Sequence, residues 1–169
     1  APKIGIVNFD AHFDLRTKNN QANSGTPFYQ LAKEHKGLPY MCLGIRKDAN
    51  DAILFKTAHA LGVRYILNEQ CVPGSQVDDQ LHRFIDQLDY LYVTIDLDGF
   101  SSAYAPGVSA ASPMGFSPTF VLGSLKTIVQ SGKLISMDLA EMNPVYDRDD
   151  QTAKLAASLI HEVAHMVLG

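Results

Sequence analysis

The chain has 169 residues, of which 46% are hydrophobic, and this is enough to form the core of one globular domain spanning residues 1–169. Its 14 basic and 18 acidic residues leave a formal net charge of −4 without a basic run, which argues against nucleic acid as a partner. The two cysteines are not in a CxxC pair and no apolar run reaches the roughly 20 residues of a membrane span. We therefore expect a cytoplasmic protein without a disulfide framework, a cysteine-rich zinc site or a membrane anchor.

Short apolar runs and helix signals alternate along the chain. The runs cover residues 4–9, 40–45, 65–67, 90–95 and 134–139 and predict strands that are buried on both faces. Between them, Thr26-Pro27 opens a helix that ends before Gly37, and Ser75 with Asp78 forms a capping box that opens another. Ser117-Pro118 opens a third helix, which closes near Gly132. Parallel strands need such crossover connections, so the pattern predicts an α/β fold with three α/β/α layers and a mainly parallel sheet.

The final helix is predicted over residues 152–168 and should cover one face of the sheet. Its apolar side chains recur at helical spacing and comprise Leu155, Leu159, Ile160, Val163 and Val167.

Acidic residues follow two of the predicted strands. Asp10, His12 and Asp14 stand at alternate positions after the first strand, and Asp96 with Asp98 stands in the same way after the fourth. Alternate side chains of extended chain share one face, so each set forms a comb of ligands. Because ligands bind at the carboxyl ends of strands in open parallel sheets, the two combs meet if their strands are neighbours.

Four carboxylates and one imidazole at one place would repel one another unless cations neutralised them. An oxygen-rich set with a histidine suits Mn²⁺ better than Zn²⁺, and this number of carboxylates suggests two Mn²⁺ ions. Such ions support metal-assisted hydrolysis. The alternative interpretation is that these aspartates are solvated turn formers, as a lone Asp-x-Asp usually is.

Three segments of the chain carry a family resemblance. Residues 10–14 read DAHFD, residues 94–98 read TIDLD, and residues 138–144 read DLAEMNP. In this order they resemble the DAHxD, [ST]xDxD and DxxExNP motifs of the ureohydrolase superfamily, which includes arginase, agmatinase and formimidoylglutamase. Residues 13–16, 24–28 and 105–109 resemble the formimidoylglutamase branch.

This resemblance implies an arginase-like fold and hydrolysis of N-formimino-L-glutamate to L-glutamate and formamide in histidine degradation. Arginases carry a histidine at the position of Phe28, so arginase activity is not favoured. Agmatinase, or another ureohydrolase of guanidino acids, is the alternative.

The resemblance also implies roles for individual residues. Asp10 and Asp96 would bridge both Mn²⁺ ions, with Asp14 completing the first ion and His12 and Asp98 the second. Asp98 would accept a proton, Glu141 would face the formimino cation, and Thr94 and Asp138 would orient the ligands. The glutamate end of the substrate would be bound by Arg16, Asn23 and Ser24, although a salt bridge is an alternative role for Arg16.

The family supplies one more histidine ligand well upstream of DAHxD, and these 169 residues do not contain its motif. We therefore expect this chain to be a C-terminal portion of a longer protein that forms a homo-oligomer. The non-enzymatic alternative is an inactive metal-binding or assembly module.

A second metal-binding pattern lies in the final helix. Residues 161–165 read HEVAH, the HExxH pattern of zinc peptidases, with both histidines on one helical face. Four residues follow it and the helix is otherwise striped with apolar residues, so a solvated helical face is the favoured interpretation.

Overall fold

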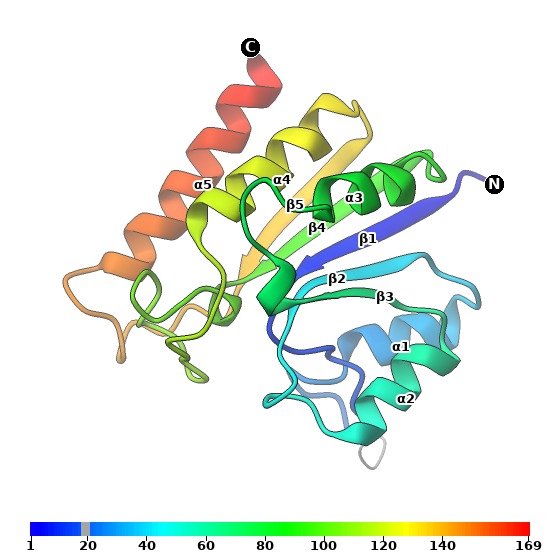
Figure 1. The fold of residues 1–169 in the computed structure, drawn as a ribbon, viewed down its shortest axis with the longest axis horizontal. Coiled ribbons are helices and arrows are strands. Elements are labelled where there is room, and N and C mark those ends of the chain that lie inside the picture. Colours follow the sequence, from blue (N-terminus) through cyan, green and yellow to red (C-terminus); the bar gives the residue numbers. More distant parts are fainter. Residues whose placement is uncertain (18–20) are drawn as a thin grey trace.

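The computed structural model describes residues 1–17 and 21–169 and contains a five-stranded parallel sheet between two layers of helices (Figure 1). The spatial order is β3-β2-β1-β4-β5. The strands are β1 (Ile4–Phe9), β2 (Tyr40–Ile45), β3 (Arg64–Leu67), β4 (Tyr90–Asp96) and β5 (Leu134–Ala140). The three-layer α/β fold is therefore confirmed, and each predicted strand is present to within one residue at either end.

Five α-helices lie on the two faces of this sheet in the described part of the chain. Helices α1 (Pro27–Glu34) and α2 (Ala52–Ala60) cover one face, while α3 (Val77–Ile85), α4 (Pro118–Gln130) and α5 (Gln151–Leu168) lie on the other (Figure 1). Each face has its own buried cluster of apolar side chains, the larger one beneath α3, α4 and α5. Their burial supplies the main stabilisation of the fold.

The centre of the sheet determines where a ligand can bind. Strand β1 pairs with β2 on one side and with β4 on the other. The chain leaves β1 toward β2 and β3 and later returns across the sheet to β4, so the order of strands reverses next to β1. In open α/β sheets such a switch point opens a crevice at the carboxyl ends of the strands. Both predicted combs begin at these ends.

Of two helix starts predicted from the sequence, the structure confirms one and contradicts the other. Ser117 is the N-cap of α4, because its hydroxyl accepts the amide of Phe120 at 3.2 Å. The predicted capping box of Ser75 and Asp78 is wrong, since α3 begins at Val77 after Gln76. The carboxylate of Asp78 instead accepts the hydroxyl of Thr127 at 2.6 Å, which ties α3 to α4.

The expectation of strands buried on both faces holds for the inner strands and fails at the edges. Residues of β1 and β2 are almost all buried, whereas β5 has no buried residue and β3 only one. An edge strand lacks one neighbour, so less of the chain covers its side chains. The predicted stripe on α5 is similarly narrow: Leu159 and Val163 are buried, while Ile160 and Val167 are exposed.

Candidate metal centre

The first comb leaves the sheet directly after β1. The carboxylate of Asp10 accepts the amide of His12 at 2.7 Å, so it closes its own turn. Asp10 is fully buried and His12 is half-buried. Asp14 has a φ of 53°, a left-handed conformation that only about a few per cent of residues other than glycine adopt. The comb is therefore a tightly shaped loop and not a continuation of the strand.

The second comb repeats this arrangement after β4. The carboxylate of Asp96 accepts the amide of Asp98 at 2.9 Å, and a short 3₁₀ helix, η3 (Leu97–Gly99), follows. Asp96 and Asp98 are both buried. Each comb thus starts with a buried aspartate whose carboxylate fixes the backbone two residues further on.

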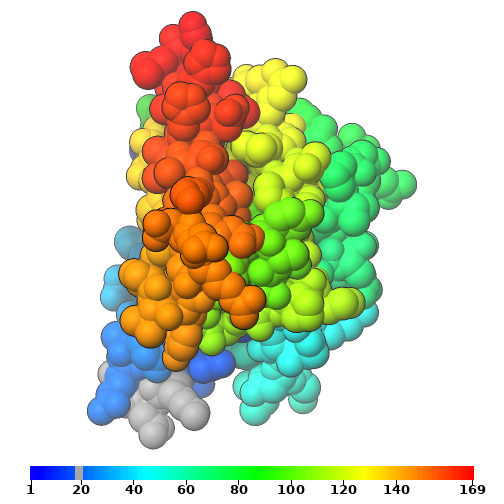
Figure 2. All heavy atoms as spheres, turned by 90° about the vertical axis from the view of Figure 1, so that its left-hand side faces the viewer, coloured from blue at the N-terminus to red at the C-terminus, as the bar shows by residue number. Residues whose placement is uncertain are grey.

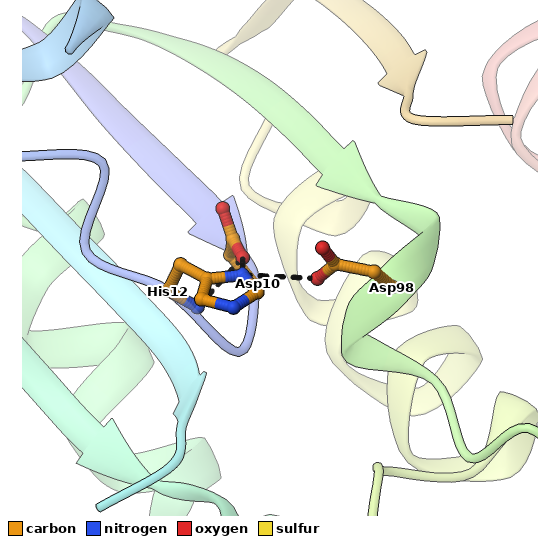
Figure 3. A group of neighbouring side chains, drawn as sticks. All are labelled: Asp10, His12 and Asp98. Atoms are coloured by element: carbon orange, nitrogen blue, oxygen red, sulfur yellow. Dashed lines mark hydrogen bonds and ion pairs between the residues drawn. The ribbon is translucent and has the colours of Figure 1, made fainter. Parts of the chain in front are cut away.

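Pairing of β1 with β4 brings the two combs together, as predicted. His12 Nδ1 lies 3.4 Å from Asp10 Oδ1 and 3.3 Å from Asp98 Oδ1, so the imidazole stands between the combs (Figure 3). Asp10, His12 and Asp98 each offer a ligand atom within 4.8 Å of the others, and so do Asp10, Asp14 and Asp96. The two groups share Asp10, whereas Asp96 belongs to one of them.

The electrostatics of the cluster show how strongly it needs positive charge. Burial, followed by the nearby charge of Asp10, raises the pKa of Asp96 to about 10 and that of Asp14 to about 8. Burial also raises the pKa of Asp10. The neighbouring carboxylates of Asp10 and then of Asp98 raise the pKa of His12 to about 10, against the opposing effect of burial. Without a cation, protons must therefore neutralise the cluster at neutral pH.

The donor set fits metal ions. Within the described residues, Asp98 Oδ1 is a buried oxygen without a hydrogen-bond partner, although His12 Nδ1 faces it. An unpaired buried carboxylate oxygen is costly, and a cation bound by both combs would satisfy it. Carboxylates with one imidazole are ligands that suit Mn²⁺.

Close backbone packing behind the combs uses two glycines. A Cβ atom at Gly44, whose φ is 109°, would lie 2.5 Å from the ring of Phe116 and 3.1 Å from the carbonyl oxygen of Asp10. A Cβ at Gly99 would lie 2.4 Å from the same ring. These glycines let β2, the segment after β4 and Phe116 approach the first comb closely.

A cavity of about 190 Å³ opens over the combs. His12, Asp14, Asp96 and Asp98 line its floor. Other residues that line it are Arg16, Ser24, Gly25, Ala49, Asn50, Leu54, Ser109, Ala110 and Glu141. Ser109 Oγ lies 3.5 Å from Glu141 Oε2, on the wall of the cavity. A small polar molecule can therefore approach the carboxylates from one side.

Not all of the residues predicted to bind substrate line the cavity. Arg16, Ser24 and Glu141 line the cavity, while Asn23 is not among the lining residues. The side-chain oxygen of Asn23 accepts the amide of Gly25 at 2.9 Å within its own turn. No carboxylate of the described residues lies within ion-pair distance of Arg16, so the alternative role in a salt bridge is not observed there.

The residues predicted to orient the ligands bind each other. Thr94 donates its hydroxyl to Asp138 Oδ1 at 2.7 Å, and Tyr92 donates to Asp138 Oδ2. On β4, Thr94 lies two residues before Asp96. It pairs with Asp138 of β5, whereas Asp96 pairs with Ala140. This cluster supports the position of β5 beside β4, from which Glu141 follows.

Three polar residues near the combs are absent from the predicted set. Asn8 and Tyr40 are buried on β1 and β2, and Asn50 is buried in the loop before α2. Asn8 has a signal in the sequence, as a polar residue inside an apolar strand. Tyr40 and Asn50 have none, because only the fold brings them beside residues 10–14.

The HExxH pattern lies apart from these groups. His161 and His165 stack with their ring centroids 6.4 Å apart on α5, and both are exposed. Among the described residues, the groups that could hold a metal include neither histidine. Figure 2 shows α5 in orange and red on the surface of the molecule. The solvated helical face is therefore the better interpretation.

None of the helices in the described part is long and apolar enough to cross a membrane.

Comparisons with known proteins agree with this geometry. The arginase family model matches residues 1–166. Formimidoylglutamases of Legionella pneumophila (strain Lens) and Aeromonas hydrophila are both 45% identical to the chain, covering 96% and 95% of it and 53% of each relative. The chain thus spans about half the length of the curated relatives that it matches.

Solved structures show the same fold. The crystal structure of formimidoylglutamase from Bacillus subtilis matches 99% of the chain with a TM-score of 0.87 and 26% identity, over 54% of its own length. A variant of Trypanosoma cruzi formiminoglutamase, solved with Mn²⁺, matches 97% of the chain and 56% of its own length with a TM-score of 0.85 and 19% identity. From the family match and these relatives, the chain belongs to the arginase family.

Proposed function

We propose that the protein containing this chain is a binuclear manganese hydrolase that cleaves N-formimino-L-glutamate to L-glutamate and formamide. The observation that carries the proposal is the pair of ligand groups sharing Asp10, at the switch point of the sheet. The names and identities of the curated relatives support the choice of substrate.

The residues present would hold the ions in two sets. Asp10, His12 and Asp98 would hold one ion, and Asp10, Asp14 and Asp96 would hold the other. Manganese bound here would lower the pKa of water and stabilise the charge that develops during attack on the amidine.

The remaining groups would act on the substrate and its protons. Glu141 projects from the end of β5 with a φ of 68°, and its carboxylate would pair with the formimino cation. Asp98, whose carboxylate lies 3.3 Å from His12 Nδ1, would also accept a proton. On the cavity wall, Arg16 would bind a carboxylate of the glutamate end with its planar fork, and Ser24 would add a hydroxyl.

The first test measures products of the natural full-length polypeptide loaded with manganese. We expect formamide from N-formimino-L-glutamate and no urea from arginine or agmatine. Asp96→Asn should reduce activity by about a hundredfold or more, because a neutral amide binds Mn²⁺ more weakly than the carboxylate it replaces. Asp79→Asn on the exposed side of α3 is the matched control and should leave activity unchanged.

Other outcomes would change the proposal in defined ways. Manganese-dependent release of urea would move the substrate to a guanidino compound such as agmatine. A preparation that binds no manganese and hydrolyses none of these substrates would show that the chain is a binding or assembly module without this activity.

A further inference from the structure

A buried chain of hydrogen bonds runs beneath the first comb. The side-chain amide of Asn8 lies 3.0 Å from Asp10 Oδ2 and 3.0 Å from the hydroxyl oxygen of Tyr40, and donates to both. The hydroxyl of Tyr40 in turn donates to the carbonyl oxygen of Phe13 at 3.1 Å. Asn8 and Tyr40 are nearly inaccessible to solvent. One side of the Asp10 carboxylate is therefore tied to β2.

The side chain of Asn50 also forms hydrogen bonds with the backbone of this loop. Its side-chain oxygen accepts the amide of Phe13 at 3.1 Å, and its side-chain amide donates to the carbonyl oxygens of Ala11 and Arg46, each at 2.8 Å. Asn50 thus joins the first comb to the end of β2. Together with Tyr40, it binds three backbone atoms between Asp10 and Asp14.

These contacts explain how an unusual loop keeps one shape. The ladder of β1 ends at Phe9, so residues 10–14 lack a continuous set of strand hydrogen bonds. Asp14 also adopts a left-handed conformation that is uncommon for residues other than glycine. Conformations of this kind persist where the surrounding structure holds them, and here Tyr40 and Asn50 both bind the backbone of Phe13, the residue before Asp14.

We propose that Asn8, Tyr40 and Asn50 are positioning residues that set the geometry of the first comb for metal binding. This inference rests on the proposed function, because it assigns manganese as the cation that the comb binds. Asn8 orients the Asp10 carboxylate directly, leaving Oδ1 facing His12. Tyr40 and Asn50 act through the backbone of residues 11–13, which determines where His12 and Asp14 project.

Tyr40→Phe tests this role with little change in packing. It removes one hydroxyl and keeps the ring that stacks on Phe28 with centroids 4.5 Å apart. Asn8→Leu removes the amide at similar volume. Loss of groups that orient metal ligands typically lowers metal affinity by about ten- to a hundredfold, and we expect a loss of this size for each variant. Because both belong to one hydrogen-bonded chain, the double variant should lose less than the product of the two.

The matched control is Tyr65→Phe. The ring of Tyr65 also contacts Phe13, with centroids 5.1 Å apart, but no described residue forms a hydrogen bond with its hydroxyl. Its manganese affinity should equal that of the wild type.

The readout is manganese affinity of the natural full-length polypeptide by titration calorimetry, with the paramagnetic resonance spectrum of the bound ions and thermal unfolding in EDTA. Weakened binding and an altered spectrum in Tyr40→Phe, with an unfolding midpoint close to the wild type, support the inference. Wild-type affinity and spectrum in Tyr40→Phe overturn it, whatever Asn8→Leu does to folding. In that case a wild type that binds manganese and releases formamide leaves the proposed function standing. A wild type that binds no manganese overturns both.

Discussion

At the scale of single residues, the chemistry of the cluster follows from taking like charges out of water. Asp10, Asp96 and Asp98 are buried side by side, and their mutual repulsion adds to the cost of burial. The pKa values of Asp14 and Asp96 rise as a result, to about 8 and about 10. The carboxylates of Asp10 and Asp98 raise the pKa of His12 to about 10, although its burial acts in the opposite direction. Protons would therefore compete for the same atoms with the metal ions that we propose.

The metal-free protein should lose stability as the pH rises. The folded-state pKa values of Asp14 and Asp96, about 8 and about 10, exceed the ordinary value of 3.8, so between these limits the folded state binds more protons than the unfolded state. His12 contributes with the same sign between 6.5 and about 10. Unfolding in EDTA from about pH 6 to about pH 9 should show a midpoint that falls with pH, and manganese in excess of the chelator should raise this midpoint.

The matched control is the same titration of Asp96→Asn, whose pH dependence should be shallower because one of the proton-binding groups is gone. A midpoint that rises with pH in EDTA would contradict the prediction. It would mean that the cluster is more open to water than the buried carboxylates indicate.

At the scale of elements, sequence signals hold where local chemistry determines the structure. The apolar runs over residues 4–9 and 40–45 coincide with β1 and β2, because both strands lie inside the sheet and are covered on both faces. The same kind of apolar run wrongly predicted that β5 is buried on both faces, because the sequence does not indicate which strand lies at the edge of the sheet. The combs were predictable from alternation alone, whereas Tyr40 and Asn50 act on the site only through strand pairing.

Two serines allow a matched test of helix capping. Ser117→Ala should lower the free energy of unfolding by about 1 kcal/mol, because its hydroxyl caps α4. Ser75→Ala should cost less than about 0.5 kcal/mol, because α3 begins after Gln76 and the contact of Ser75 with the amide of Val77 is long, at 3.5 Å. Urea unfolding of the two variants provides the measurement. Equal losses would show that Ser75 caps α3 after all.

The start of α5 is capped by a residue that the usual sequence pattern of a helix N-terminus does not predict. The Asp147 carboxylate accepts the amides of Thr152 and Ala153 at 3.0 and 3.2 Å, although it precedes the helix by several residues. These bonds hold the pKa of Asp147 below its ordinary value, with burial acting in the opposite direction. The hydroxyl of Thr152 accepts the amide of Gly107 at 2.7 Å, so the start of α5 also fixes the loop that carries Ser109.

At the scale of the whole molecule, the fold gathers the acidic residues of both combs at one end of the sheet. The combs lie at the carboxyl ends of β1 and β4, while the HExxH histidines lie on the exposed surface of α5. Position in the fold therefore separates two motifs that are both plausible metal sites in the sequence.

The double variant His161→Ala with His165→Ala should retain its manganese content and its rate of formamide release to within about twofold, because surface substitutions away from a site rarely perturb it. Elemental analysis and the formamide assay measure both quantities. His12→Ala is the comparison variant and should lose about one of the two manganese ions, because His12 belongs to one of the two ligand groups. Loss of metal or activity in the α5 variant would place a functional metal on that helix.

The pairing of Phe9 with Ile95 also affects the order in which the site can form during folding. The two combs stand on strands that are neighbours in space but have β2, β3 and three α-helices between them in the chain. The site is therefore complete only after this long segment has folded and β4 has joined β1. An ion that needs both combs cannot guide the early collapse of the chain, and it acts instead by slowing the unfolding of the native state.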